Sequence, residues 1–246
     1  MTGPTRRRVL VTGGSRGIGA AIVTALAGRG ADVAFTYRTD EHAAERVLAA
    51  VAQLPGSATA WVHSLGRDDP AQLVDEAVAT LGGLDSMILN AGMWSGGRLA
   101  DTDEGQWWDL VETNLRGSAR IVRAGLASLT HSAAGSITFV GSVVGLNGFA
   151  GDTAYASSKA AMVGLARSLA KELGRDGIRV NLVAPGFIET EMSAEVSAAT
   201  RERIFQRSVL RRFGTADEVA GATVFLSEDA SFATGTVLPV DGGWTL

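Results

Sequence analysis

Short runs of apolar residues alternate with longer stretches of helical periodicity along the whole chain. Each apolar run ends near glycine or polar residues, as is typical of strands buried on both faces of a sheet. The alternation predicts one α/β domain over residues 1–246, a doubly wound parallel sheet of seven strands with helices on both faces. The predicted strands are 7–14, 31–37, 58–64, 84–92, 135–142, 178–186 and 235–243. The predicted helices are 18–30, 40–54, 70–82, 105–129, 153–174 and 216–227.

Composition and charge narrow the class of protein. The 246 residues are 46% hydrophobic and 20% charged, a balance typical of globular chains. The formal charge of −4 argues against a nucleic-acid binder. The chain has no cysteine and only His42, His63 and His131, which lack metal-ligand spacing, so we expect no metal site. With no apolar run of signal-peptide or membrane-span length, we expect a cytoplasmic protein.

The first candidate motif is the glycine-rich turn "TGGSRGIG" at residues 12–19. It stands between the first predicted strand and the first predicted helix, which is the context of a dinucleotide site. Gly13 allows the tight turn, Gly17 lets the backbone approach a pyrophosphate, and Gly19 lets helix and strand pack closely. The amides at the helix N-terminus would then face the phosphates.

The end of the second predicted strand indicates which dinucleotide is bound. An NAD site needs an acid there to hold the ribose hydroxyls, but Tyr37 takes that place and Arg38 follows it. Arg16 projects from the glycine turn, and two guanidiniums suit a 2′-phosphate. Asp40 is the alternative ribose acid, although its place before a helix favours an N-cap. The pattern favours NADP(H) over NAD(H).

Tyr155 and Lys159 are the candidate proton-transfer pair. On the predicted helix they are separated by four residues and therefore share a face, although such pairs also occur on solvated helices. An ammonium beside a phenol should lower the pKa of the phenol, so that Tyr155 can give a proton to a carbonyl oxygen. Ser142, at the end of the fifth predicted strand, could donate a hydrogen bond to the same oxygen.

Several motifs occur together in a familiar order. They are "TGGSRGIG", "NAG" at 90–92, Asn114, Ser142, "YASSK" at 155–159 and "PGFIETEM" at 185–192. In this set the chain resembles the short-chain dehydrogenase/reductases, which have a Rossmann-type sheet, and most of all the 3-oxoacyl-[acyl carrier protein] reductases. The resemblance implies hydride transfer from NADPH to a ketone and a tetrameric assembly. The four-residue spacing of Tyr155 and Lys159 disfavours an enoyl reductase, in which the two are typically further apart.

The resemblance also implies roles for individual residues. The implied catalytic set is Asn114, Ser142, Tyr155 and Lys159; Asn114 would hold a water that feeds protons toward Lys159. The implied cofactor-binding residues are Gly13, Ser15, Arg16, Gly17, Ile18, Gly19, Arg38, Asn90, Ala91, Gly92, Tyr155, Lys159, Pro185, Gly186, Ile188 and Thr190. The implied substrate pocket is formed by Trp94, Val144, Phe149, Phe187 and Met192.

Three functions compete on the sequence. The leading one is reduction of a 3-oxoacyl thioester on acyl carrier protein, in fatty-acid or polyketide biosynthesis. The others are an NADP-dependent carbonyl reductase or alcohol dehydrogenase for a free small molecule, and a dinucleotide-sensing regulator without catalysis. An acidic carrier needs a basic docking surface, yet residues 126–135 carry no Lys or Arg. We expect instead that one helix aligns Arg203, Arg207 and Arg211 to receive the carrier, unless they form only a solvated face.

Overall fold

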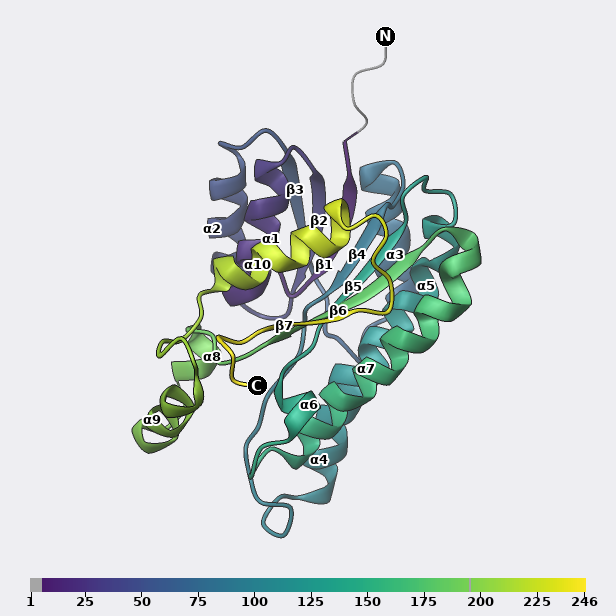
Figure 1. Ribbon diagram of the computed structural model, residues 1–246. Helices are drawn as coiled ribbons and strands as arrows, with labels where there is room; N and C mark the ends of the chain where they lie inside the picture. Colours follow the sequence, from purple (N-terminus) through teal and green to yellow (C-terminus); the bar gives the residue numbers. More distant parts are fainter. Residues whose placement is uncertain (1–5, 195) are drawn as a thin grey trace.

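The computed structural model describes residues 6–194 and 196–246, which fold around one sheet of seven parallel strands (Figure 1). The order across the sheet is β3-β2-β1-β4-β5-β6-β7, so the chain winds outward from β1 in both directions. This confirms the predicted doubly wound architecture. The strands are β1 Arg8–Thr12, β2 Asp32–Tyr37, β3 Ser57–Val62, β4 Ser86–Leu89, β5 Ser136–Val140, β6 Arg179–Pro185 and β7 Val237–Val240.

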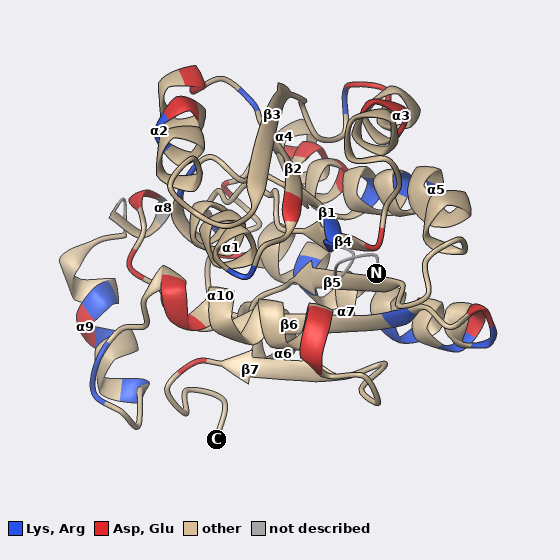
Figure 2. Ribbon diagram, turned by 90° about the horizontal axis from the view of Figure 1, so that it is seen from above, with Lys and Arg blue, Asp and Glu red and all other residues tan. Residues whose placement is uncertain are grey.

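Helices cover both faces of this sheet (Figures 1 and 2). One face carries α1 Gly17–Gly28, α2 Glu41–Val51 and α10 Ala216–Val224, which continues as a short π-helix, η3 Phe225–Asp229. The other face carries α3 Pro70–Leu81, α4 Glu104–Val111, the π-helix η1 Glu112–Gly117, α5 Ser118–Leu129, α6 Val144–Asn147 and α7 Thr153–Leu173, which is followed by the 3-10 turn η2 Gly174–Asp176. Two helices, α8 Glu191–Ala194 and α9 Ala198–Arg207, project beyond the carboxyl ends of the strands.

The core consists of two apolar layers, one on each side of the sheet. Successive side chains of a strand point to opposite faces, so Leu10 packs in the layer under α3, α5 and α7, while Val11 packs in the layer under α1 and α2. Phe139 and Phe35 are the largest buried side chains of the respective layers. Burial on both faces explains why the strands read as apolar runs rather than as alternating patterns.

The long predicted helix over residues 105–129 contains an irregularity that the sequence pattern did not indicate. It is divided into α4, η1 and α5, and the middle segment is wound as a π-helix. Such insertions often occur at functional sites because they turn one side chain out of the regular helical order. Here the inserted turn contains Asn114.

The expectation of one helical arginine face is wrong. Helix α9 ends at Arg207, and its C-cap, Ser208, has extended backbone. Arg211 lies beyond the helix with φ 52°, and its guanidinium donates to the backbone and side-chain oxygens of Gln206. The local backbone therefore turns Arg211 out of line, and only Arg203 and Arg207 lie on the helix.

Membrane insertion of a helix finds no support in the described ranges. Throughout residues 6–194 and 196–246, the helices lack either the length or the apolar composition that crossing a bilayer requires.

Candidate active site

The glycine-rich turn joins β1 to α1 at the carboxyl edge of the sheet. Gly13 has φ 67°, and a Cβ placed on it would lie 2.9 Å from the Cα of Ala91. A Cβ on Gly19 would collide with the carbonyl oxygen of Gly13. Gly17 has φ 52°, and a Cβ there would lie 3.3 Å from Cγ2 of Thr190. The turn therefore needs glycine for a left-handed backbone at Gly13 and Gly17 and for close packing at Gly19.

The "NAG" segment after β4 braces this turn. The Asn90 amide nitrogen donates to the carbonyl oxygens of Thr12 and Gly13, at 3.1 and 2.9 Å. The backbone amides of Asn90 and Ala91 both donate to the Thr12 hydroxyl at 3.0 Å. The amide group of the Asn90 side chain is thus directed at the turn and holds it in shape.

The N-terminus of α1 has the features of a phosphate cradle. Its N-cap residue, Arg16, makes no side-chain capping bond, so the Arg16 side chain does not accept from the first backbone amides of the helix. The Arg16 guanidinium lies 3.3 Å from the carboxylate of Glu191, and both side chains are exposed. With this geometry, the residues of the turn and the neighbouring Thr190 fit the pyrophosphate of a dinucleotide.

The end of β2 carries the groups expected to distinguish NADP from NAD. Arg38 is exposed and forms no hydrogen bond or ion pair with the described part of the chain. Asp40 is the N-cap of α2, and its carboxylate accepts the backbone amide of Ala43 at 2.9 Å. The N-cap interpretation of Asp40 is therefore confirmed, and this carboxylate is committed to the helix.

The structure brings Ser142, Tyr155 and Lys159 together beyond the ends of β5 and β6. Ser142 follows β5, and its hydroxyl oxygen accepts the backbone amide of Val144 at 3.1 Å. The same hydroxyl is close enough to Tyr155, in the first turn of α7, to lower the pKa of its phenol. Lys159 is one turn further along α7 and is 4% exposed. Its ammonium donates to the carbonyl oxygen of Val140 at 2.9 Å and lies 5.6 Å from the centre of the Tyr155 ring.

The direction of the Tyr155 pKa differs from the expectation. Burial raises the pKa of Tyr155 to about 12; the Ser142 hydroxyl opposes this rise, and the negative charge of Asp152 adds to it. Burial also lowers the pKa of Lys159 to about 8. The expected net lowering of the tyrosine pKa is therefore wrong for this arrangement, because burial outweighs the contacts that favour the phenolate.

Asn114 joins two parts of the site. Its side-chain oxygen accepts the backbone amide of Met93 at 2.8 Å, and its side-chain nitrogen donates to the carbonyl oxygen of Met93 at 2.9 Å. The same nitrogen contacts the Ser158 hydroxyl at 3.2 Å. Asn114 is fully buried, so this network holds the segment after "NAG" against α7. The expected role in holding a water remains a prediction.

The predicted mouth residues come from three different segments. Trp94 follows the "NAG" segment, and its indole nitrogen donates to the carboxylate of Asp152 at 3.1 Å. Phe149 lies 6.5 Å from Trp244 between ring centres, and Val144 begins α6. The side chain of Met192, also expected here, lies outside the described residues. The sequence interpretation missed Asp152 and Trp244, although the place of Asp152 directly before the predicted helix, three residues from Tyr155, could have indicated it.

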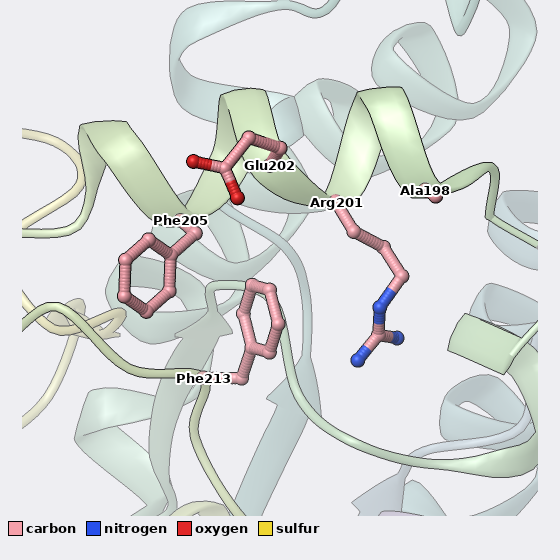
Figure 3. Close-up of a pocket in the computed structure, with 5 residues that line it drawn as sticks. All are labelled: Ala198, Arg201, Glu202, Phe205 and Phe213. Carbon is pink, nitrogen blue, oxygen red and sulfur yellow. The ribbon is translucent and has the colours of Figure 1, made fainter.

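The segment after β6 forms the other wall. Gly186 allows close contact with the backbone of Asp241, and Ile188 is buried beside Gly214. The Phe187 and Phe213 rings lie 4.6 Å apart, and the Arg201 guanidinium lies 5.2 and 4.8 Å from their centres. Figure 3 shows the pocket of about 220 Å³ that Phe213 and Arg201 form with Phe205 of α9. These aromatic and cationic contacts attach α9 to the cofactor side of the cleft.

The positions named from the sequence thus converge on one edge of the sheet. The glycine turn, "NAG", Ser142, the Tyr155–Lys159 pair and the segment from Pro185 to Thr190 all lie beyond strand carboxyl ends, as ligand sites of doubly wound sheets do. Of the α9 arginines, Arg201 packs against this edge through Phe187 and Phe213, whereas Arg203 and Arg207 are exposed. A ketone between Ser142 and Tyr155 could receive two hydrogen bonds on its oxygen.

Comparisons with known proteins agree with this geometry. A family model described as enoyl-(acyl carrier protein) reductase matches residues 13–245. The chain is 39% identical over 238 residues to the 3-oxoacyl-[acyl-carrier-protein] reductase FabG of Salmonella typhimurium, covering 95% of each chain.

Two solved structures are similar in fold. A short-chain dehydrogenase from Burkholderia cenocepacia in complex with NADP has a TM-score of 0.92 and 35% identity, over 98% of this chain and 99% of the other. Levodione reductase has a TM-score of 0.90 and 30% identity, over 96% of both chains. The similar proteins therefore include a reductase named for 3-oxoacyl-[acyl-carrier-protein] and a reductase named for levodione.

Proposed function

The chain belongs to the short-chain dehydrogenase/reductase family, and from this premise we propose that it reduces 3-oxoacyl thioesters on acyl carrier protein to the 3-hydroxyacyl form with NADPH. The single observation that carries the catalytic part is that Ser142 and the buried Lys159, whose ammonium lies 5.6 Å from the Tyr155 ring centre, both stand beside Tyr155. The relatives named as 3-oxoacyl reductases support the substrate class.

The cofactor would be held along the carboxyl edge of β1 and β4. The turn from Gly13 to Gly19 and the N-terminus of α1 would hold the pyrophosphate. Arg38 and Arg16 would bind the 2′-phosphate, and Tyr155 and Lys159 would border the nicotinamide end. NADPH, when bound, supplies the hydride that reduces the ketone carbon.

The residues of the chain itself orient the ketone and supply the proton. Because the Ser142 oxygen already accepts the Val144 amide, its own proton is available to donate to the substrate oxygen. Tyr155 gives its proton to that oxygen as negative charge develops there. The pKa of Lys159 is about 8, so the group is mostly ammonium at neutral pH and can stabilise the phenolate that Tyr155 leaves.

Docking of the carrier is proposed for the two arginines that remain on α9. Arg203 and Arg207 are both exposed and are separated by one helical turn; Arg207 also lies over the Trp244 ring, 5.8 Å from its centre. Figure 2 shows basic segments on α9 at the margin of the molecule. An acidic carrier bound there would stand next to the wall formed by Phe187 and Phe213.

A free ketone is the second candidate substrate. The observation that favours it is the loss of Arg211 from the arginine face, together with the absence of Lys and Arg from residues 126–135. With two arginines instead of three, the docking surface for an acidic carrier is smaller than the sequence indicated.

One assay series tests the choice. NADPH oxidation is measured with acetoacetyl-carrier protein, with an acetoacetyl thioester of N-acetylcysteamine, and with a panel of free ketones. Carrier docking predicts the highest kcat/KM for the carrier-bound substrate, and a rise in its KM when Arg203 and Arg207 are both changed to Glu. The small thioester should be unaffected by this change, and the wild-type advantage should decrease with salt.

Lys171, near the end of α7, and Arg175, in η2, form a second and smaller candidate docking patch. If α9 receives the carrier, reversing these two charges should leave both substrates unchanged. Equal damage to both substrates by the α9 reversal would indicate that the wall of the cleft is disturbed. Turnover of free ketones alone, with none of either thioester, would overturn the proposed substrate class.

A further inference from the structure

Asp152, whose carboxylate lies close in the chain to the proton donor Tyr155, is not part of the proposed catalytic set. It precedes α7, its side chain is 9% exposed, and one carboxylate oxygen, Oδ1, accepts the indole N–H of Trp94 at 3.1 Å. The backbone around it is joined to the Trp94 segment as well, because the amide of Gly97 donates to the carbonyl oxygen of Gly151 at 2.6 Å. Two segments of the cleft mouth thus hold this carboxylate in place.

The Asp152 carboxylate is an electrostatic neighbour of the proton donor. It stands three residues before Tyr155, at the N-cap of α7 rather than within the helix. Its negative charge acts on the Tyr155 hydroxyl and disfavours the phenolate. A substrate whose ketone oxygen contacts Tyr155 and Ser142 therefore has Asp152 near its substituents.

The charge on Asp152 has no compensating cation. Among residues 6–194 and 196–246, no Lys or Arg forms an ion pair with this carboxylate. The second oxygen, Oδ2, has no hydrogen-bond partner in that part of the chain, yet it is not among the fully buried polar atoms. This oxygen therefore keeps some contact with solvent. Burial raises the pKa of Asp152, and the Trp94 donor opposes this rise by favouring the charged form.

We propose that Asp152, held by Trp94, is a charge-selecting residue that admits neutral 3-oxo compounds and excludes those with a carboxylate beside the ketone. A free 3-oxo acid would bring a second negative charge into a partly desolvated cleft, where like charges repel more strongly than in water. Esters and thioesters of the same acid carry no such charge. This inference rests on the proposed function, because it concerns the ketone cleft of the same site.

The test compares one neutral and one anionic substrate of the same skeleton. NADPH oxidation is measured with ethyl acetoacetate and with acetoacetate, for the wild type and for Asp152→Asn, which keeps an acceptor for Trp94. The wild type should prefer the ester. The substitution should raise kcat/KM for acetoacetate relative to the ester on the order of 10-fold or more, because it removes a charge from a low-dielectric site.

Two control variants isolate the charge. Asp152→Glu keeps the carboxylate and should retain the wild-type preference. Asp101→Asn removes an exposed carboxylate from the segment that follows Trp94 and should change neither substrate. A ratio that stays at the wild-type value in Asp152→Asn would overturn the proposal, and so would an equal gain for both substrates.

Failure of the proposed function gives a different result. If the wild type reduces neither substrate, the 3-oxoacyl assignment fails, and charge selection is then measured by binding. Dissociation constants of 3-hydroxybutyrate and its ethyl ester are determined on the NADPH-loaded protein by nucleotide fluorescence. Selective tightening of the anion in Asp152→Asn would support charge selection, and an unchanged ratio of the two constants would refute it.

Discussion

Asp85 and Lys159, at opposite ends of the sheet, have opposite surroundings. At the amino end, the Arg8 guanidinium donates to both carboxylate oxygens of Asp85, at 2.9 and 2.8 Å, and the Ser132 hydroxyl donates to the same carboxylate at 2.7 Å. At the carboxyl end, Lys159 is more deeply buried but faces only a neutral carbonyl oxygen.

The pKa values record this difference. Hydrogen bonds from Arg8 and Ser132 outweigh burial and lower the pKa of Asp85 to about 2. Burial without a counter-charge lowers the pKa of Lys159 to about 8 and raises that of Tyr155 to about 12. Asp85 at the amino end is thus held in its charged form, whereas Lys159 can change charge near neutral pH. The paired Asp85 contributes to stability, whereas the unpaired Lys159 is available for chemistry.

The largest expected effect is on the proton donor. Tyr155→Phe removes the phenol oxygen and leaves the ring in place, so turnover should fall about 1,000-fold while NADPH still binds. Steady-state kinetics and nucleotide fluorescence measure the two quantities. Turnover within a few fold of the wild type would show that another group supplies the proton.

Lys159→Met should separate activity from stability at the carboxyl end. Turnover should fall about 100-fold, because the phenolate loses its cation. The free energy of unfolding should stay the same or rise, because an unpaired buried charge is replaced by an apolar side chain. Activity assays and urea unfolding at pH 7 report both, and a large loss of stability would show that the ammonium is a structural group.

The pH dependence of stability sharpens the same point. Between about pH 8 and 10.5 the unfolded chain keeps the Lys159 proton that the folded chain releases, so raising the pH favours folding. Above pH 10 the raised pKa of Tyr155 acts in the opposite direction. Urea unfolding of the wild type should therefore show a gain in stability between about pH 8 and 10 that Lys159→Met lacks.

Arg38 is the unpaired counterpart of Arg8. Because it lacks a partner in the described part of the chain, Arg38→Asp should leave stability unchanged but lower the preference for NADPH over NADH roughly 50-fold, through loss of a charge-assisted hydrogen bond. Dissociation constants for both nucleotides measure this. Arg46→Asp, on the exposed side of α2, is the matched control, and an unchanged preference in Arg38→Asp would exclude contact with the 2′-phosphate.

The smallest change in activity is expected at the amino end. Asp85→Asn should lower the free energy of unfolding by about 2 kcal/mol at pH 7, because it breaks a largely buried ion pair, and should leave turnover per folded molecule unchanged. The stability that Asp85 contributes is present above its unfolded pKa of 3.8 and is lost as the pH falls through about 2.

Urea unfolding across that acid range should therefore show a shallower loss for Asp85→Asn than for the wild type. Some loss should remain, because Arg212 and the Thr215 amide also lower the pKa of Glu218 to about 2. Reduced turnover in folded Asp85→Asn would show that the two ends of the sheet are coupled.

Local pattern was sufficient for the seven strands and for the glycine turn. The apolar runs along the chain predict the seven strands. The glycine turn is predicted because Gly13 and Gly17 stand where a left-handed or crowded backbone needs glycine. The shared face of Tyr155 and Lys159 follows from helical spacing alone. These features depend on neighbours within one turn or one strand, which the sequence displays directly.

Pairings and pKa values that depend on distant residues could be read only from the folded structure. The direction of the Tyr155 pKa, the end of the arginine helix at Arg207 and the contact between Trp94 and Asp152 all lay beyond local pattern. Trp94 and Asp152 are 58 positions apart, and whether such side chains meet depends on how the whole sheet brings its loops together. The amino-acid sequence alone shows which ionisable groups are present at the site. Packing of the fold sets which of them are buried and which are paired, and burial and pairing in turn set their charge.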